Sequence, residues 1–92
     1  MISNLSNVVN IGPDTEAKLI QVGIESYEKL VLTGTEDAFI KLQTLDPGAC
    51  LCLLYGLDGA IQGVKSSHLS PERKNELQQF YKMAKKQLLL KM

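Results

Sequence analysis

The sequence predicts an all-α fold: a single compact domain of five to six helices spanning residues 1–92. Three observations indicate this class. Apolar residues recur at helical spacing in six segments. These segments are separated by Gly, Pro and Asp. No stretch has the alternation of apolar and polar residues that is typical of a strand. A chain of 92 residues, 45% of them hydrophobic, is long enough to bury one core without a metal or disulfide.

The N-terminal stretch, residues 5–24, has the pattern of a helix-hairpin-helix-like unit. Apolar positions predict a short helix over about residues 3–9 and a second helix that begins at Pro13 and ends at Gly23. Pro13 suits a first helical turn, where its missing N–H needs no partner. Asn10 stands where many such hairpins have Gly, and Asn is the next-best residue for a left-handed backbone.

Three further helices are predicted between this unit and the C-terminal helix, over about residues 27–33, 36–45 and 49–63. The last of these is apolar over much of its surface, which predicts a central position. It also contains Gly56, Gly59 and Gly63, with Ala60 between them. Each glycine would weaken a helix by roughly 0.5–1 kcal/mol relative to Ala. We therefore expect another helix to approach closely along this glycine strip, with a pocket as the alternative.

A long amphipathic helix is predicted from about residue 71 to the C-terminus, with Ser70 as its N-cap. One apolar stripe runs along it, formed by Leu77, Phe80, Tyr81, Ala84 and Leu88. Other apolar residues fall off this stripe, namely Met83, Leu89 and Leu90. They are candidates for a surface that contacts a protein partner or a second copy. The alternative is a frayed helix end.

Several classes of protein are disfavoured by the composition. No apolar run reaches the roughly 18–20 residues of a membrane span, and the N-terminus lacks the pattern of a secretory signal. We therefore predict a cytoplasmic protein without membrane contact. Cys50 and Cys52 would point about 200° apart on a helix, and His68 is the only histidine. We expect no catalytic residue, no metal ligand and no cofactor.

Charge is distributed unevenly along the chain. Residues 1–64 contain three Lys and eight acidic residues, a balance of −5, whereas residues 65–92 contain seven cations and two acidic residues, a balance of +5. Such asymmetry indicates an anionic partner for the C-terminal part. It is equally typical of a basic helix that docks on the acidic part of its own domain or of a second copy.

Four blocks of sequence together resemble a known family. They are the Asn-Ile-Gly-Pro turn at residues 10–13, Val-Gly-Ile at 22–24, Leu-Leu-Tyr-Gly-Leu-Asp-Gly-Ala-Ile at 53–61, and Pro-Glu-Arg-Lys-Asn-Glu-Leu at 71–77. In these blocks the chain is similar to the C-terminal domain of TfoX/Sxy competence regulators, over roughly residues 5–80. The resemblance implies an all-α domain with a hairpin unit and without enzymatic activity. Full-length members regulate genes for natural DNA uptake and carry a separate N-terminal domain.

Two functions are expected on these grounds. The favoured one is a non-catalytic binding or regulatory domain that acts through protein–protein interaction in a transcription- or competence-related pathway. The alternative is sequence-nonspecific DNA binding, with backbone contacts from the hairpin turn and the basic C-terminal helix. Its candidate residues are Ile11, Gly12, Thr15, Lys18, Lys82, Lys85 and Lys86. Asp14 and Glu16 place negative charge beside the turn, which disfavours phosphate binding.

Overall fold

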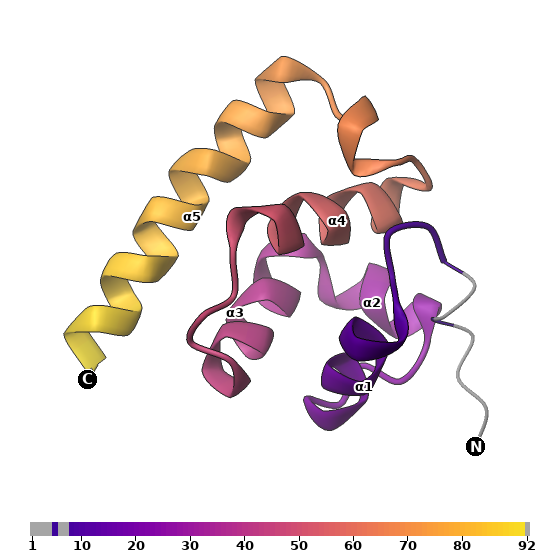
Figure 1. Ribbon diagram of the computed structural model, residues 1–92, viewed down its shortest axis with the longest axis horizontal. Coiled ribbons are helices and arrows are strands. Elements are labelled where there is room, and N and C mark those ends of the chain that lie inside the picture. Colours follow the sequence, from indigo (N-terminus) through magenta and orange to yellow (C-terminus); the bar gives the residue numbers. More distant parts are fainter. Residues whose placement is uncertain (1–4, 6–7, 92) are drawn as a thin grey trace.

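The computed structural model describes residues 5 and 8–91, and within these it contains five α-helices and no strand (Figure 1). The elements are α1 (Pro13–Gln21), α2 (Tyr27–Thr33), α3 (Thr35–Leu45), α4 (Leu51–Gln62), the short 3₁₀ helix η2 (Ser66–His68) and α5 (Pro71–Lys91). The predicted all-α class is confirmed. The helix predicted over residues 3–9 falls mostly on residues 1–4 and 6–7, which lie outside the described part of the chain.

Local sequence explains where the helices begin and end. The Ser26 hydroxyl accepts a hydrogen bond from the Lys29 N–H at 3.1 Å and caps α2. In the same way the Ser70 hydroxyl accepts from the Arg73 N–H at 3.1 Å at the start of α5. Gly23 has φ +90 and lets the Ile24 N–H reach back to the Leu19 carbonyl at 2.8 Å. The predicted boundaries of α2 to α5 agree with the structure to within two residues.

Helix α4 is central, as its composition predicted. Leu54, Leu57 and Ala60 are fully buried, and α4 contacts α2, α3 and α5. In Figure 1 α4 crosses the middle of the molecule, α1 and α2 lie to the right, and α5 forms the left side.

The apolar stripe of α5 packs on α3 around one aromatic side chain. The Phe39 ring is completely buried and meets the Phe80 ring at 6.2 Å and the Tyr81 ring at 6.0 Å, both edge to face. Leu77 and Ala84 are also buried. The stripe predicted from periodicity is therefore the face by which α5 contacts the rest of the domain.

The glycine strip of α4 faces a turn rather than the helix that we expected. Asn10, with φ +70, donates from Nδ2 to the Val64 carbonyl at 3.0 Å and to the Gly56 carbonyl at 3.4 Å. Its Oδ1 accepts from the Ser66 N–H at 3.2 Å. A Cβ added to Gly59 would lie 2.6 Å from the Val64 oxygen and 2.7 Å from Asn10 Nδ2. The prediction of a helix neighbour was wrong because the close approach is made by backbone and an amide side chain.

A buried carboxylate joins α5 to α4 and α3. Asp58 on α4 is 3% exposed, and its carboxylate accepts from Arg73 Nε at 3.1 Å and from Arg73 Nη2 at 2.8 Å. Thr35 Oγ1 at the start of α3 donates to Oδ1 at 2.9 Å, and Gln62 Nε2 donates to Oδ2 at 2.6 Å. Burial alone would raise the pKa of Asp58, but these hydrogen bonds, led by those from Arg73, hold it below its ordinary value. The ionised carboxylate thus fixes the first turns of α5.

Replacing Gly59 by Ala should destabilise the domain, whereas the same change at Gly56 should not. The Gly59→Ala methyl would collide with the Asn10 turn, and overpacking of this kind lowers the free energy of unfolding by roughly 1–3 kcal/mol. At Gly56 the nearest atom to an added Cβ is Asn10 Cβ at 3.6 Å, an ordinary contact. Gly56→Ala should therefore be neutral or gain up to about 1 kcal/mol of helix propensity. Urea denaturation measures the free energy of unfolding of both variants. Equal stability of the two would contradict the close approach of Asn10 and Val64 to Gly59.

Asp58→Asn should destabilise the domain and make its stability depend less on pH in the acid range. Removing one partner of a buried pair costs on the order of 3 kcal/mol. Because the folded pKa is lowered, Asp58 contributes stability that is present above the unfolded value of about 3.9 and is lost as pH falls through the folded value. Urea midpoints from pH 7 to pH 2 should fall more steeply for the wild type than for Asp58→Asn. Asp37→Asn, at an exposed residue, serves as the control. Parallel curves for wild type and Asp58→Asn would refute this role.

Candidate functional site

The hairpin residues proposed to hold DNA mostly contact other parts of the domain. The Ile11 side chain is 6% exposed and belongs to the core. Gly12 is the exposed N-cap residue of α1, and its carbonyl accepts from the Glu16 N–H at 2.9 Å. Thr15 is half-buried. Within this turn Gly12 and Thr15 are therefore the candidates that reach the surface.

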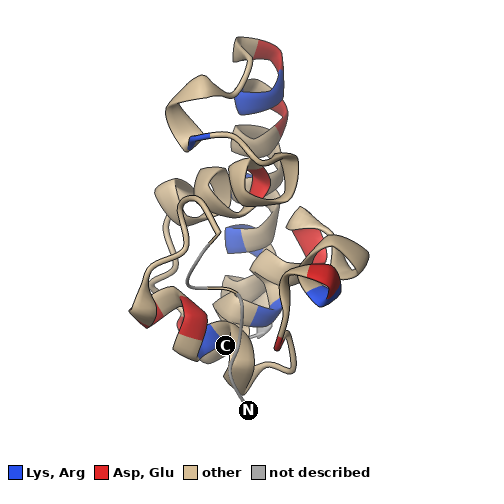
Figure 2. Cartoon of the chain, turned by 90° about the vertical axis from the view of Figure 1, so that its right-hand side faces the viewer, with Lys and Arg blue, Asp and Glu red and all other residues tan. Residues whose placement is uncertain are grey.

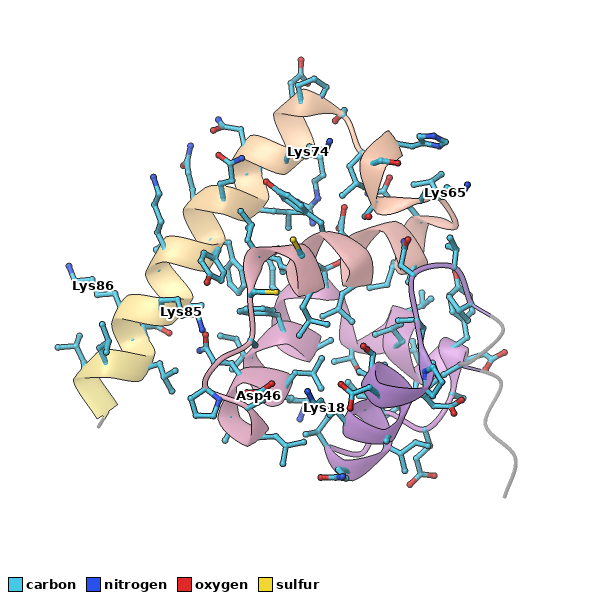
Figure 3. All side chains as sticks on the ribbon, in the orientation of Figure 1. Lys18, Asp46, Lys65, Lys74, Lys85 and Lys86 are labelled. Atoms are coloured by element: carbon cyan, nitrogen blue, oxygen red, sulfur yellow. The ribbon has the colours of Figure 1, made fainter. Side chains whose placement is uncertain are left out.

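Lys18 is engaged by two carboxylates. Its Nζ lies 3.2 Å from Asp14 Oδ2 and 3.1 Å from Asp46 Oδ2. The hydrogen bond to Asp46, followed by that to Asp14, raises the pKa of Lys18, and Lys18 in turn lowers the pKa of Asp46. Figure 3 shows Lys18 and Asp46 side by side at the base of the molecule. The charge that would attract a phosphate is thus already neutralised within the domain.

The α5 lysines are presented differently from one another. Lys85 Nζ donates to the Pro47 carbonyl at 2.8 Å and lies 5.5 Å from the centroid of the Tyr81 ring, a cation–π distance. Lys82 and Lys86 are exposed. The turn that follows α3 therefore lies between the two groups of candidate DNA contacts, since Lys18 binds its Asp46 and Lys85 binds its Pro47 (Figure 3). DNA contact by these residues stays a prediction.

The three predicted partner-surface residues are strongly exposed. Met83 is 60%, Leu89 71% and Leu90 77% exposed. At 3.6 residues per turn, residues seven positions apart lie almost in line along a helix. Met83 therefore aligns with Leu90 and Lys82 with Leu89, and Lys86 falls between these two rows. We name this set the terminal α5 surface, formed by Lys82, Met83, Lys86, Leu89 and Leu90.

Three polar contacts hold α5 so that this surface faces outward. Gln78 Nε2 donates to the Tyr55 hydroxyl at 2.8 Å, and Gln43 Nε2 donates to the Ala84 carbonyl at 3.1 Å. Lys85 adds its bond to the turn after α3. Gln43, which is 4% exposed although polar, was not predicted as a contact residue from the sequence. The available signal was its spacing, because Gln43 follows the buried Phe39 by four residues and so shares its face.

A second apolar surface lies on α2 and was also missed. Leu32 is 84% and Val31 44% exposed. Together with Tyr27 and Glu28 they line a shallow depression of about 490 Å³, which we name the α2 patch. The local sequence is acidic, because residues 25–37 contain four acidic residues and one Lys. Figure 2 views the side that lies to the right in Figure 1, where acidic and basic segments lie next to each other on the helices at both flanks.

The described residues form no metal-binding cluster, disulfide or membrane-spanning helix. No group of three or more His, Cys, Asp or Glu among these residues is placed to hold a metal ion. Cys50 and Cys52 are free and exposed. None of the described helices combines the length and apolar character needed to cross a membrane.

Solved structures provide two close likenesses. One is the crystal structure of an uncharacterized protein from Listeria monocytogenes in a triclinic form, 37% identical, with a TM-score of 0.81 over 83% of this chain and 86% of that chain. The other is a protein of unknown function from Listeria monocytogenes in a tetragonal form. It is 35% identical, with a TM-score of 0.85 over 87% of this chain and 99% of that chain.

A family match covers most of the chain, although no curated protein matches it. The profile of the TfoX C-terminal domain matches residues 1–81. It includes α1 to α4 and the first half of α5, and it ends just before the terminal α5 surface. On this match, the chain belongs to the TfoX C-terminal domain family.

Proposed function

We propose that this chain is a non-catalytic binding domain that acts through protein–protein contact, with the terminal α5 surface as its contact site. One observation carries the proposal: Met83, Leu89 and Leu90 are each at least 60% exposed at the end of a helix that is otherwise packed on the domain. Exposed apolar side chains that gather on one surface mark interaction sites. Membership of the TfoX C-terminal domain family supports a regulatory role in a transcription- or competence-related pathway.

The chemistry of the surface favours a protein with an acidic, partly apolar face. Lys82 and Lys86 lie among the three apolar side chains and supply positive charge without a described ion pair. Lysines around an apolar centre steer an acidic partner and orient it, while burial of the leucines supplies affinity. A phosphate backbone would use the lysines but leave the leucines in water. A protein partner uses both.

Introducing two acidic residues at the tip of α5 should weaken partner binding without unfolding the domain. The Leu89→Glu/Leu90→Glu variant introduces two acids at exposed positions, so its melting temperature should match that of the wild type. Loss of two apolar anchors should weaken binding at least about tenfold. Affinity-tagged chain is used to enrich partners from the host, and the dissociation constant is then measured with the purified partner. Ile20→Glu, at a 41% exposed residue on α1, is the matched control.

The proposal fails if the double variant binds the purified partner as tightly as the control does. It also fails if the tagged wild-type chain enriches no protein over a tag-only sample, untagged copies of the chain itself included, since a contact domain requires an occupant. Comparing melting temperatures separates loss of the surface from loss of the fold.

DNA binding is the alternative function, and it is tested separately. Because Lys18 is paired with Asp14 and Asp46, we expect no saturable binding to fluorescein-labelled duplex or single-stranded DNA by anisotropy. The assay is run at ~50 mM salt, where phosphate contacts are strongest. Binding that weakens linearly with the logarithm of salt concentration, and that is lost in Lys82→Ala/Lys86→Ala, would favour DNA over protein.

A further inference from the structure

We propose that the terminal α5 surface of one molecule binds the α2 patch of a second copy, in a head-to-tail contact. This inference rests on the proposed role of α5 as a contact site and names its occupant. Both surfaces belong to this chain, both expose large apolar side chains, and their surroundings carry opposite charge.

The apolar parts of the two surfaces match. The α2 patch exposes Leu32 at 84% and Val31 at 44% beside the shallow, largely apolar depression that these residues line. The terminal α5 surface offers Leu89 and Leu90, each more than 70% exposed, from the end of the helix. Contact between them removes apolar area from water on both sides, which drives association.

The charges around the two surfaces are complementary. Lys82 and Lys86 stand on the terminal α5 surface, and residues 77–90 contain no acidic residue, whereas residues 25–37 contain four acidic residues and one lysine. Glu28 itself lines the α2 patch. Opposite potentials steer the encounter and fix its orientation.

Helix α5 forms few ion pairs with the rest of the described chain. Of the ion pairs among the described residues, the Arg73–Asp58 pair alone joins α5 to the rest of the chain. The lysines of the terminal α5 surface, Lys82 and Lys86, are exposed and have no such pair. Arg73 and Lys85 thus bind α5 to its own domain, and the exposed Lys82 and Lys86 remain available to a partner.

A symmetric pairing of two α5 helices satisfies these groups less well. In a parallel pair Lys82 and Lys86 would face the same lysines of the second copy, and like charges repel. In an antiparallel pair that overlaps along the whole helix, Leu89 and Leu90 would lie against the start of α5, where Glu72, Asn75 and Glu76 are exposed. In an antiparallel pair that overlaps only at the helix ends, Lys86 would lie close to Lys86 of the second copy, and like charges repel. The α2 patch offers apolar side chains to the leucines and nearby acidic residues to the lysines.

The placement of the two surfaces makes the contact intermolecular. Figure 1 shows the C-terminal end of α5 at the far left and α2 to the right of α3, so the two are separated along the longest axis of the molecule. A contact of this heterologous kind leaves one free surface of each type on every dimer, and it therefore continues into a chain or closes into a ring. Both surfaces are small, so we expect weak, reversible association that salt screens.

Sedimentation velocity of the full chain, at concentrations up to about 1 mM and at low and high salt, tests the contact. The average mass should rise with concentration and fall with added salt. Leu32→Glu, which damages the α2 patch, and Leu89→Glu/Leu90→Glu, which damages the α5 surface, should each remain monomeric. An equimolar mixture of the two variants should form a 1:1 dimer and nothing larger, because one intact pair of surfaces remains.

Milder variants guard against loss of the fold. Leu32→Gln and Leu90→Gln should each reduce association, by less than the Glu variants do, while keeping the melting temperature of the wild type. Dimers formed by Leu32→Glu alone would overturn the head-to-tail contact in favour of paired α5 helices. Binding to vesicles of anionic phospholipid or to DNA, with a monomeric chain at every concentration, would assign the surface to that occupant and also overturn it.

The outcomes separate this inference from the proposed function. A chain that stays monomeric at about 1 mM but loses an external protein partner through Leu89→Glu/Leu90→Glu refutes self-association and keeps α5 as a contact site. A chain that neither self-associates nor binds a protein refutes both.

Discussion

The orientation of α5 depends on one buried carboxylate. An ionised carboxylate offers about four lone-pair sites, and Asp58 fills them with donors from Arg73, Thr35 and Gln62. A charge that is 3% exposed is stable only when it is satisfied in this way. Since Arg73 and Thr35 lie at the first turns of α5 and α3, the donors that Asp58 requires also set the directions of those helices. The exposed end of α5 is presented as a consequence.

Much of this fold could be predicted from the sequence because its helix boundaries are local features. Ser26, Ser70 and Pro13 begin helices by mechanisms that involve only their near neighbours. The glycine strip of α4 was a different case. The sequence indicated that something approaches Gly59, but the approaching groups belong to Asn10 and Val64. Asn10 is 49 positions away in the chain, and periodicity carries no information about contacts at that separation.

The candidate site shows the same division between local and distant information. Helical periodicity placed Met83, Leu89 and Leu90 off the apolar stripe, and the structure finds them exposed. Lys18, in contrast, was proposed as a phosphate ligand from its place beside the turn. Its pair with Asp14 is local, and the negative charge beside the turn was visible in the sequence. Its ion pair with Asp46 spans 28 positions, so this part of the neutralisation could not be predicted from charges near the turn. The α2 patch was missed because a seven-residue helix is too short for a periodic pattern to show which face is exposed.

A fixed helix end is well suited to binding a partner. The Arg73–Asp58 pair holds the start of α5, Phe39 packs against its middle, and Lys85 bonds to the turn after α3. Only about the last two turns carry the exposed leucines, and they extend a helix that is already ordered. Association through this end would therefore lose little backbone entropy, a loss that otherwise opposes binding by small surfaces. The family match ends at residue 81, so Arg73, which pairs with Asp58, lies inside the matched part of the chain, whereas the exposed Met83, Leu89 and Leu90 lie beyond it. In the proposed function these last residues would supply the partner contacts.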